Sequence, residues 1–190
     1  MITTVRTTFL SAIFIFFFAH FAKAQPNKGE FIEIAIGYGL SLPYDDVDIS
    51  GSGFYAQGEY VFALTSWFGL RPYAGFIITS TDENDDYVPD YKVTSKAFLL
   101  GGKARFAAPI PWVAPYIEIG LGTSLGKFET YTPYTNLEKS GLLVHIPFTL
   151  GLALGPENNV EVAFTYYVHP AVEQVSGAAA IGLSFPLNRN

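Results

Sequence analysis

The stretch LLVHIPFTLGLALGPENNVEVAFTYYV, residues 142–168, contains two runs of alternating residues joined by a short polar turn. In the first run every second residue from Leu142 to Leu154 is apolar, and the residues between are small or polar. The alternation resumes at Val160, and a period of two is typical of β-strands. Both runs exceed the about five or six residues of an average strand and match the about 9–11 that cross a bilayer.

The same pattern recurs in eight segments, and the connections between them alternate between long and short. One face of these segments is apolar and uncharged, whereas the other carries Glu, Arg and Lys. A soluble lipocalin-like barrel would instead bury its apolar face and expose its polar one. We therefore predict an all-β fold, an eight-stranded antiparallel up-and-down transmembrane β-barrel. The expected strands are residues 31–40, 54–64, 67–79, 95–106, 114–128, 142–154, 160–168 and 177–187.

The N-terminus has the three parts of a secretory signal peptide. Arg6 provides the positive charge, residues 9–19 the apolar run, and Ala22-Lys23-Ala24 the cleavage site. The apolar run is too short for a membrane-spanning helix, so an uncleaved anchor is the less favoured alternative. We expect a signal peptide at residues 1–24 and an outer-membrane β-barrel domain at residues 25–190.

Composition excludes several other classes of protein. The chain has no Cys, which excludes a disulfide framework and a lipid-modified N-terminal Cys. No later apolar run is long enough for a transmembrane helix. Without Arg6 and Lys23, 9 of the 11 basic residues remain against 17 acidic ones, so nucleic acid is not an expected partner.

The connections predict how the barrel sits in the membrane. Short turns at residues 65–66, 108–112 and 155–159 should face the periplasm. Acidic loops at residues 43–53 and 81–90, and a tyrosine-rich loop at residues 131–139, should face outward. Trp67 and Trp112 lie at short turns, where an interfacial aromatic girdle would place them.

These features resemble the small eight-stranded outer-membrane barrels, the OmpA/OmpX-like and outer membrane protein beta-barrel families. The resemblance is carried by the signal peptide, PYAG at residues 72–75, PYIEIGLG at 115–122 and AAAIGLSFPL at 178–187. It implies a porin-like protein of the cell envelope that is placed in the outer membrane by the barrel-insertion machinery. The family often ends on an aromatic residue, whereas here Phe185 is followed by Pro-Leu-Asn-Arg-Asn.

Seven charged residues fall on the inward face near the short-turn ends of their strands. A turn at residues 64–66 would place Glu59 opposite Arg71, and one at 110–113 would place Arg105 opposite Glu118. Opposed side chains lie close enough for bidentate Arg–carboxylate bonds. The set is either a gate or ion path, or a salt-bridged plug, and we favour the plug because side chains just fill eight-stranded barrels. The predicted lumen charge network is Glu33, Glu59, Arg71, Lys103, Arg105, Glu118 and Glu161.

Two histidines are the candidates for metal ligands. The turn after Leu154 would place His145 opposite His169 inside the barrel, towards its outer end. Imidazole is a common ligand of transition metals, but no third ligand is evident, although Glu173 is close in sequence. We therefore expect a hydrogen-bonded histidine pair, no metal site and no cofactor.

His169 also raises an enzymatic alternative. Lipid A deacylases are outer-membrane barrels of similar size with a Ser-His-acid arrangement and a His-x-Ser-Asn-like stretch. Here His169 is followed by Pro170 and Ala171, so the nucleophilic Ser is missing. Ser176 with Glu173 would replace it only if Ser176 lay within hydrogen-bond reach of His169. We expect no catalytic residues and no enzyme activity.

The acidic loops suggest what the outer surface meets. Their carboxylates could hold Ca²⁺ or Mg²⁺ against lipopolysaccharide, but they do not match an EF-hand, and solvated loops are favoured. The expected partners are outer-membrane lipid, lipopolysaccharide, the barrel-insertion machinery and an extracellular ligand at the acidic loops. We expect a structural or surface-interaction role with a closed lumen. The alternatives are a narrow channel or transporter for small or apolar molecules and, third, a lipid A-modifying enzyme.

Overall fold

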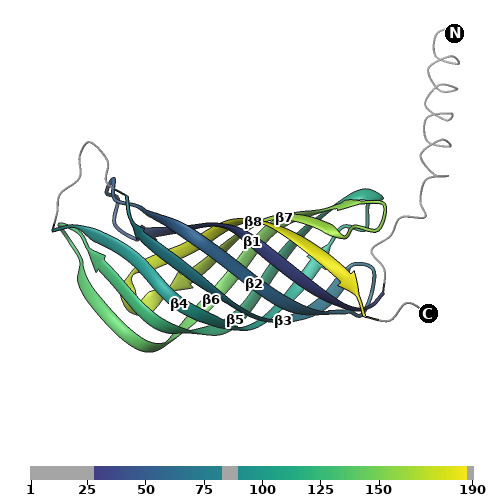
Figure 1. Ribbon diagram of the computed structural model, residues 1–190, viewed down its shortest axis with the longest axis horizontal. Helices are drawn as coiled ribbons and strands as arrows, with labels where there is room; N and C mark the ends of the chain where they lie inside the picture. The colour runs from purple at the N-terminus through teal and green to yellow at the C-terminus, as the bar shows by residue number, and fades with distance from the viewer. Residues whose placement is uncertain (1–27, 83–89, 188–190) are drawn as a thin grey trace, which may run out of the picture.

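The computed structural model describes residues 28–82 and 90–187, which form one closed β-barrel (Figure 1). Each strand pairs antiparallel with the next, and β1 pairs with β8, so the predicted eight-stranded up-and-down barrel is confirmed. The predicted signal peptide, residues 1–24, lies outside the described residues. The elements are β1 (Gly29–Pro43), β2 (Gly51–Ala63), β3 (Phe68–Thr81), β4 (Lys92–Ala107), β5 (Trp112–Tyr131), β6 (Asn136–Gly155), β7 (Val160–His169), η1 (Pro170–Val172) and β8 (Gln174–Pro186).

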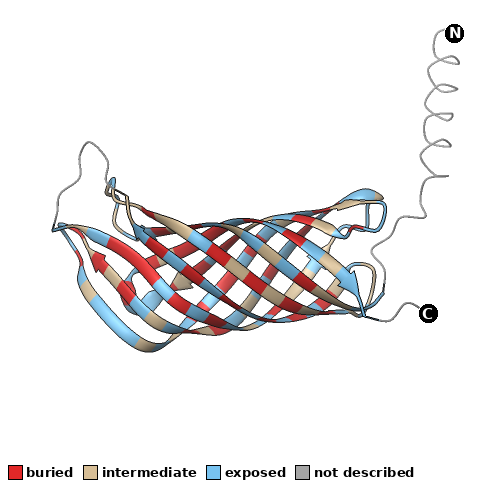
Figure 2. Cartoon of the chain, in the orientation of Figure 1, coloured by how far each residue is buried: buried red, intermediate tan, exposed pale blue. Residues whose placement is uncertain are grey.

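Burial alternates along every strand, as Figure 2 shows by the bands of colour that cross the ribbons. The side chains that point out of the barrel are large and apolar, and Leu121 and Leu142 are 65% and 69% exposed. The side chains that point inward include most of the buried Glu, Arg, Lys, Ser and Thr. This inverted distribution is that of a barrel whose outer surface meets lipid. Among residues 28–82 and 90–187, no helix is long and apolar enough to cross a membrane.

The two ends of the barrel differ in their connections. Residues 64–67, 108–111 and 156–159 form short turns at one end, which we call the inner end, and β1 begins and β8 ends there (Figure 1). Trp67 and Trp112 are 52% and 55% exposed at this end. The opposite, outer end carries the connections at residues 44–50, 132–135 and 170–173, and β3 ends and β4 begins there.

The predicted tyrosine-rich loop at residues 131–139 is wrong. β5 and β6 are each 20 residues long, and only residues 132–135 connect them. The backbone N–H of Thr132 donates to the carbonyl of Thr135 at 2.8 Å, while the Thr132 hydroxyl accepts the N–H groups of Tyr134 and Thr135. These bonds close a compact turn, so the hairpin extends where the sequence suggested a loop.

One predicted cross-strand pair is also wrong. Glu59 pairs with Tyr73 and not with Arg71, because the last pair before the turn is Ala63 with Gly69, which leaves five residues between the paired positions where three were expected. The Thr65 hydroxyl accepts the backbone N–H of Phe68 at 2.9 Å, which includes Trp67 in the turn. A shift of two residues keeps every side chain on its face, so Arg71 still points inward. The predicted pairing of Arg105 with Glu118 is confirmed.

Candidate functional site

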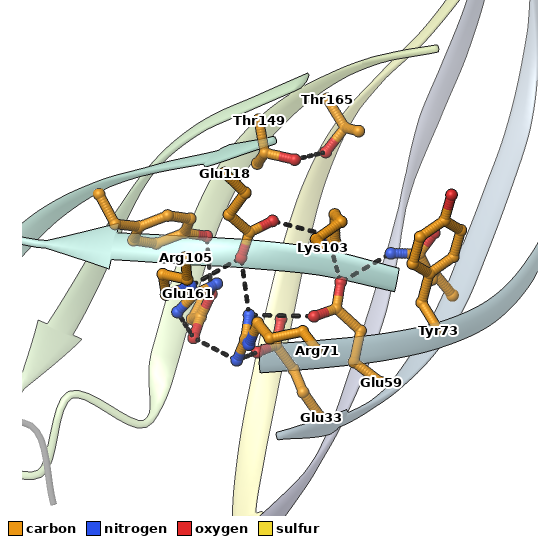
Figure 3. Close-up of polar contacts among 12 residues, drawn as sticks. Glu33, Glu59, Arg71, Tyr73, Lys103, Arg105, Glu118, Thr149, Glu161 and Thr165 are labelled. Carbon is orange, nitrogen blue, oxygen red and sulfur yellow. Dashed lines mark hydrogen bonds and ion pairs between the residues drawn. The ribbon is translucent and has the colours of Figure 1, made fainter. Parts of the chain in front are cut away.

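The inner half of the lumen contains a layer of ion pairs, which we call the charge layer. Its residues come from six strands and share contacts across the barrel, as Figure 3 shows. The layer consists of Glu33 on β1, Glu59 on β2, Arg71 on β3, Lys103 and Arg105 on β4, Glu118 on β5 and Glu161 on β7. The structure therefore brings together all seven residues that the sequence placed on the inward face.

Arg71 is the centre of the charge layer, and its guanidinium contacts four carboxylates. Nη2 lies 2.5 Å from Glu33 Oε2 and 3.3 Å from Glu161 Oε1. Nη1 lies 3.1 Å from Glu59 Oε2 and 3.2 Å from Glu118 Oε1. A single cation thus links four strands, β1, β2, β5 and β7, to its own strand β3.

The two bases on β4 complete the layer. Lys103 Nζ contacts Glu59 at 2.5 Å and Glu118 at 2.6 Å. Arg105 makes a bidentate bond to Glu161, at 2.6 and 2.5 Å, and its Nε donates to Glu118 at 2.6 Å. Its guanidinium also lies 3.5 Å from the centre of the Tyr116 ring. Bidentate and stacked contacts of this kind favour Arg over Lys.

Burial makes the charge layer sensitive to the loss of any member. All its side chains are at most 5% exposed except that of Arg105, at 13%. Removing one partner of a buried pair is strongly destabilising, since the remaining charge is left without compensation. Every base here contacts at least two carboxylates, so the charges hold one another in place across the lumen.

A neutral layer, which we call the histidine layer, lies on the outer side of the charge layer. The rings of His145 and His169 are 5.4 Å apart, as expected from their predicted opposition. The hydroxyl of Ser124 lies between them, 2.6 Å from His145 Nδ1 and 2.8 Å from His169 Nε2. The Tyr73 hydroxyl lies 2.5 Å from His145 Nε2, and His169 Nδ1 lies 3.0 Å from the Tyr167 carbonyl oxygen.

These contacts orient every hydrogen in the histidine layer when both imidazoles are neutral. A carbonyl oxygen only accepts, so His169 Nδ1 donates to Tyr167 and its Nε2 accepts from Ser124. The Ser124 oxygen then accepts from His145 Nδ1, and His145 Nε2 accepts from the Tyr73 hydroxyl. The two histidines thus have the same tautomer, with the proton on Nδ1. Ser124 was not predicted as a site residue. Its inward position was visible in the sequence, but its distance from the histidines depends on the β5–β6 register.

The histidine layer is joined to the charge layer by a second set of hydrogen bonds. The Tyr167 hydroxyl donates to Gln57 at 2.5 Å, and Gln57 donates to Glu59 at 2.7 Å. Packing here is close, because a Cβ at Gly122 would meet the Tyr73 hydroxyl, His145 and the Leu100 backbone. The polar side chains of the two layers therefore fill the middle of the barrel as one connected unit.

A third layer, of hydroxyl and amide groups, lies nearer the outer end. Ser95 contacts Ser41 at 2.8 Å and Ser176 at 2.7 Å, and the Gln174 amide also donates to it. This position bears on the enzymatic alternative. The Ser176 hydroxyl bonds to Ser95 within the described residues, and the Glu173 carboxylate accepts from Thr135 at 3.2 Å. These contacts do not assemble a triad of Ser176, His169 and Glu173.

His145 and His169 were the candidates for metal ligands, although no metal site was expected. In the part of the chain that the structure describes, no group of three or more His, Cys, Asp or Glu side chains is suited to hold a metal ion. Both histidines instead contact Ser124.

The inner end of the lumen is hollow. A cavity of about 360 Å³ lies between the turns at residues 64–67 and 156–159. Phe31 and Phe68 are part of its wall, and Arg71, Arg105 and Glu161 of the charge layer are part of its lining. Water can therefore approach the charge layer from the inner side, and Arg105 is the member that it reaches.

No family model and no curated protein matches this chain. Among solved structures, Neisserial surface protein A is similar at 12% identity with a TM-score of 0.56, over 84% of this chain and 98% of that one. The outer membrane protein OprG from Pseudomonas aeruginosa matches at 13% identity and a TM-score of 0.56, over 86% and 99%. The attachment invasion locus protein Ail of Yersinia pestis matches at 19% identity and a TM-score of 0.49, over 84% and 100%. The similarity to Neisserial surface protein A and OprG shows that the chain has the fold of the small eight-stranded outer-membrane barrels.

Proposed function

We propose that this outer-membrane barrel is closed, and that it has a structural or surface-interaction role rather than that of an open pore. The charge layer is the observation that carries this proposal. Seven charged side chains from six strands contact one another across the lumen, and Arg71 alone contacts four carboxylates. A hydrated ion would have to displace these contacts in order to pass.

The free energy of opening supports the same conclusion. Removing one partner of a buried ion pair costs about 3–5 kcal/mol, because the charge that remains is uncompensated, and moving the two ions apart inside the lumen leaves both uncompensated. A path through the layer requires several such separations at once. The histidine layer and the hydroxyl layer also lie across the route, and their hydrogen bonds would have to break as well.

The outer end is then the part of the barrel that is available for interactions. Asp45 accepts a hydrogen bond from Thr132 at 2.5 Å, so the first outer connection is held against the β5–β6 hairpin. The barrel surface supplies an apolar band for outer-membrane lipid, next to which lipopolysaccharide would lie. An extracellular ligand would meet the outer connections and the hairpin.

A narrow channel is the second candidate. The inner cavity favours it, since it brings solvent to Arg105. For a lipid A-modifying enzyme we find no comparable support, because Ser176, His169 and Glu173 do not form a triad. We propose no catalytic activity.

Single-channel conductance in a planar bilayer tests the closed lumen. The mature wild-type protein should be silent, and a variant with Glu59→Gln and Glu118→Gln should leak, because Lys103 loses both of its carboxylates. Glu129→Gln, a change outside the lumen, is the matched control and should stay silent. Steady conductance by the wild type would overturn the proposal in favour of the channel. A different gel migration of boiled and unboiled samples confirms that each variant is folded.

A further inference from the structure

The cavity at the inner end of the lumen has a buried amide in its wall. Asn158 lies in the turn between β6 and β7 and is part of the lining of this cavity. The residue is only 7% exposed, and neither its Oδ1 nor its Nδ2 has a hydrogen-bond partner within residues 28–82 and 90–187. Burying a polar group without a partner destabilises a fold. The turn therefore keeps a donor and an acceptor at the cavity that the described chain does not use.

The backbone of the turn does not account for this amide. Asn158 has a φ of 52°, in the left-handed region that Gly and Asn adopt most readily. Its backbone N–H donates to the Gly155 carbonyl at 3.1 Å. Gly would suit this conformation equally well and would bury no polar side chain. We therefore look for the partner of the Asn158 side chain in the cavity.

Arg105 provides further donors at the deep end of the cavity. A guanidinium has five N–H groups. Arg105 donates one bond to Glu118 and two to Glu161 (Figure 3), so two N–H groups remain without a partner among the described residues. Tyr116 covers one face of the guanidinium, and the Arg105 side chain is still the most exposed of the charge layer. A carbonyl oxygen in the cavity could accept from it.

The charges around the cavity favour an uncharged ligand. The charge layer has four carboxyl groups and three bases, so an anion would add to an excess of acid. A cation would instead meet Arg105, and Lys28 also lines the cavity. Burying a charge without a partner is costly. A neutral amide avoids both repulsions, and its N–H and C=O groups complement the acceptor and the donor of the Asn158 side chain.

The cavity also has an apolar wall. Phe31 and Phe68 contribute aromatic rings, and the small side chains of Ala63 and Ala107 leave space beside them. The volume of about 360 Å³ lies at the lower end of the about 300–1,000 Å³ that is typical of ligand pockets. Such pockets combine apolar walls with a few polar groups that orient the ligand. The site therefore fits a small amide with one apolar side group.

We propose that the inner cavity binds a small, uncharged amide of peptide chemistry from the periplasm. A carbonyl oxygen of the ligand accepts from Arg105, an amide group pairs with Asn158, and an apolar side group packs against Phe31 and Phe68. Short turns of such barrels face the periplasm, so the ligand enters between the turns at residues 64–67 and 156–159. This site goes beyond the proposed function, which concerns the outer end of the barrel.

The test uses the mature protein in lipid nanodiscs and the probe N-acetyl-phenylalaninamide, which has two amides, a phenyl ring and no charge. Trp67 is part of the cavity lining, and Trp112 is the only other tryptophan of the chain. The fluorescence of Trp67 in a Trp112→Phe background therefore reports on the site, and a saturable change is expected. The anion N-acetyl-phenylalanine and the cation phenylalaninamide should each bind about tenfold more weakly, which corresponds to about 1.4 kcal/mol.

Two substitutions test the place of binding. Asn158→Gly keeps the left-handed backbone but removes the side-chain amide, and should weaken binding of the neutral probe about tenfold, or about 1.4 kcal/mol. Ala63→Phe places a ring in the cavity and should abolish binding. Asn136→Ala, an exposed change at the outer end, is the matched control and should leave binding unchanged. A different gel migration of boiled and unboiled samples shows that each variant is folded.

Three results would overturn the inner site. They are a fluorescence change that rises linearly with probe concentration, as in partition into lipid, equal binding of the charged relatives, and unchanged binding by either cavity variant. None of them bears on the closed lumen, which the bilayer measurement tests separately. Steady conductance together with saturable binding would overturn the closed lumen and keep the inner site.

Discussion

The charge layer and the histidine layer fill neighbouring parts of one lumen with different chemistry. The charge layer is built from ions, and Arg71 contacts carboxylates from four strands. The histidine layer is neutral, and each of its groups has one or two hydrogen-bond partners. An ion loses more than a neutral group when its partner is removed, because its desolvation is more costly. Although the side chains of both layers are buried, a substitution in the charge layer should therefore lower the stability more than one in the histidine layer.

The largest effect is expected for Arg71→Met. Four carboxylates would remain with only Lys103 and Arg105, which leaves uncompensated charge in the lumen. We expect a loss of about 3–5 kcal/mol of stability, measured as the shift of the urea midpoint in detergent. Lys96→Met, an exposed site, should shift the midpoint little. An Arg71→Met barrel as stable as the wild type would contradict the difference between the layers.

Ser124→Ala should have the next largest effect. It removes the hydroxyl that accepts from His145 and donates to His169, and leaves two buried ring nitrogens unpaired. Each such group costs about 1–3 kcal/mol when unsatisfied. The exposed control Ser140→Ala should show no such loss of stability. Nitrogen NMR of the wild type should show that both neutral imidazoles are protonated at Nδ1. Opposite tautomers in the two rings would contradict the order of donors and acceptors around Ser124.

Gly122→Ala tests how closely the histidine layer is packed. The added methyl group would meet the Tyr73 hydroxyl and His145, and overpacking of this kind costs about 1–3 kcal/mol. Gly102→Ala is the matched control, since a Cβ there meets nothing within 4 Å. Thermal unfolding, followed by gel mobility, should separate the two variants. Equal melting of both would show that the layer can rearrange around a methyl group.

The smallest effect is expected outside the lumen, at Glu129 on the outer extension of β5. Hydrogen bonds from Lys127 and Thr94 hold the pKa of the Glu129 carboxyl below its ordinary value. A lowered pKa adds stability above the ordinary carboxyl pKa, and that stability is lost as the pH falls through the folded-state value. Glu129→Gln should therefore lower the urea midpoint slightly at pH 7, with no difference from the wild type in strong acid. A larger difference between the variant and the wild type in acid than at pH 7 would show that the pKa of Glu129 is not lowered.

The sequence predicted the barrel and the faces of its strands because a period of two needs no knowledge of neighbouring strands. Arg71 and Lys103 were placed inward on this basis alone, and the structure agrees. Which residues meet across the lumen depends on register, and register depends on turn length. The turn that includes Trp67 shifted Glu59 from Arg71 to Tyr73. Glu59 and Arg71 still make contact, at 3.1 Å, because long side chains reach across the lumen.

The contact between Ser124 and the two histidines could not be predicted from the sequence, because it also depends on strand register. Ser124 is one of several small inward residues of β5, and nothing in its local pattern distinguishes it. The hairpin at residues 132–135 was missed because its Thr and Tyr residues suggested a loop. Its turn is closed by the Thr132 hydroxyl, which accepts the backbone N–H groups of Tyr134 and Thr135. The long outer extension of β6 follows from that turn.

The arrangement around Arg71 also has a consequence for assembly. Its carboxylates come from strands near both ends of the chain, Glu33 on β1 and Glu161 on β7, while Ser184 on β8 donates to Glu33 at 3.2 Å. A nascent sheet that has not yet joined its first and last strands cannot gather these groups around one guanidinium. The contacts of Arg71 with Glu33 and Glu161 therefore form only in the closed cylinder. A barrel that lacks β1 or β7 leaves Arg71 without one of its carboxylates, which opposes release of the barrel into the bilayer.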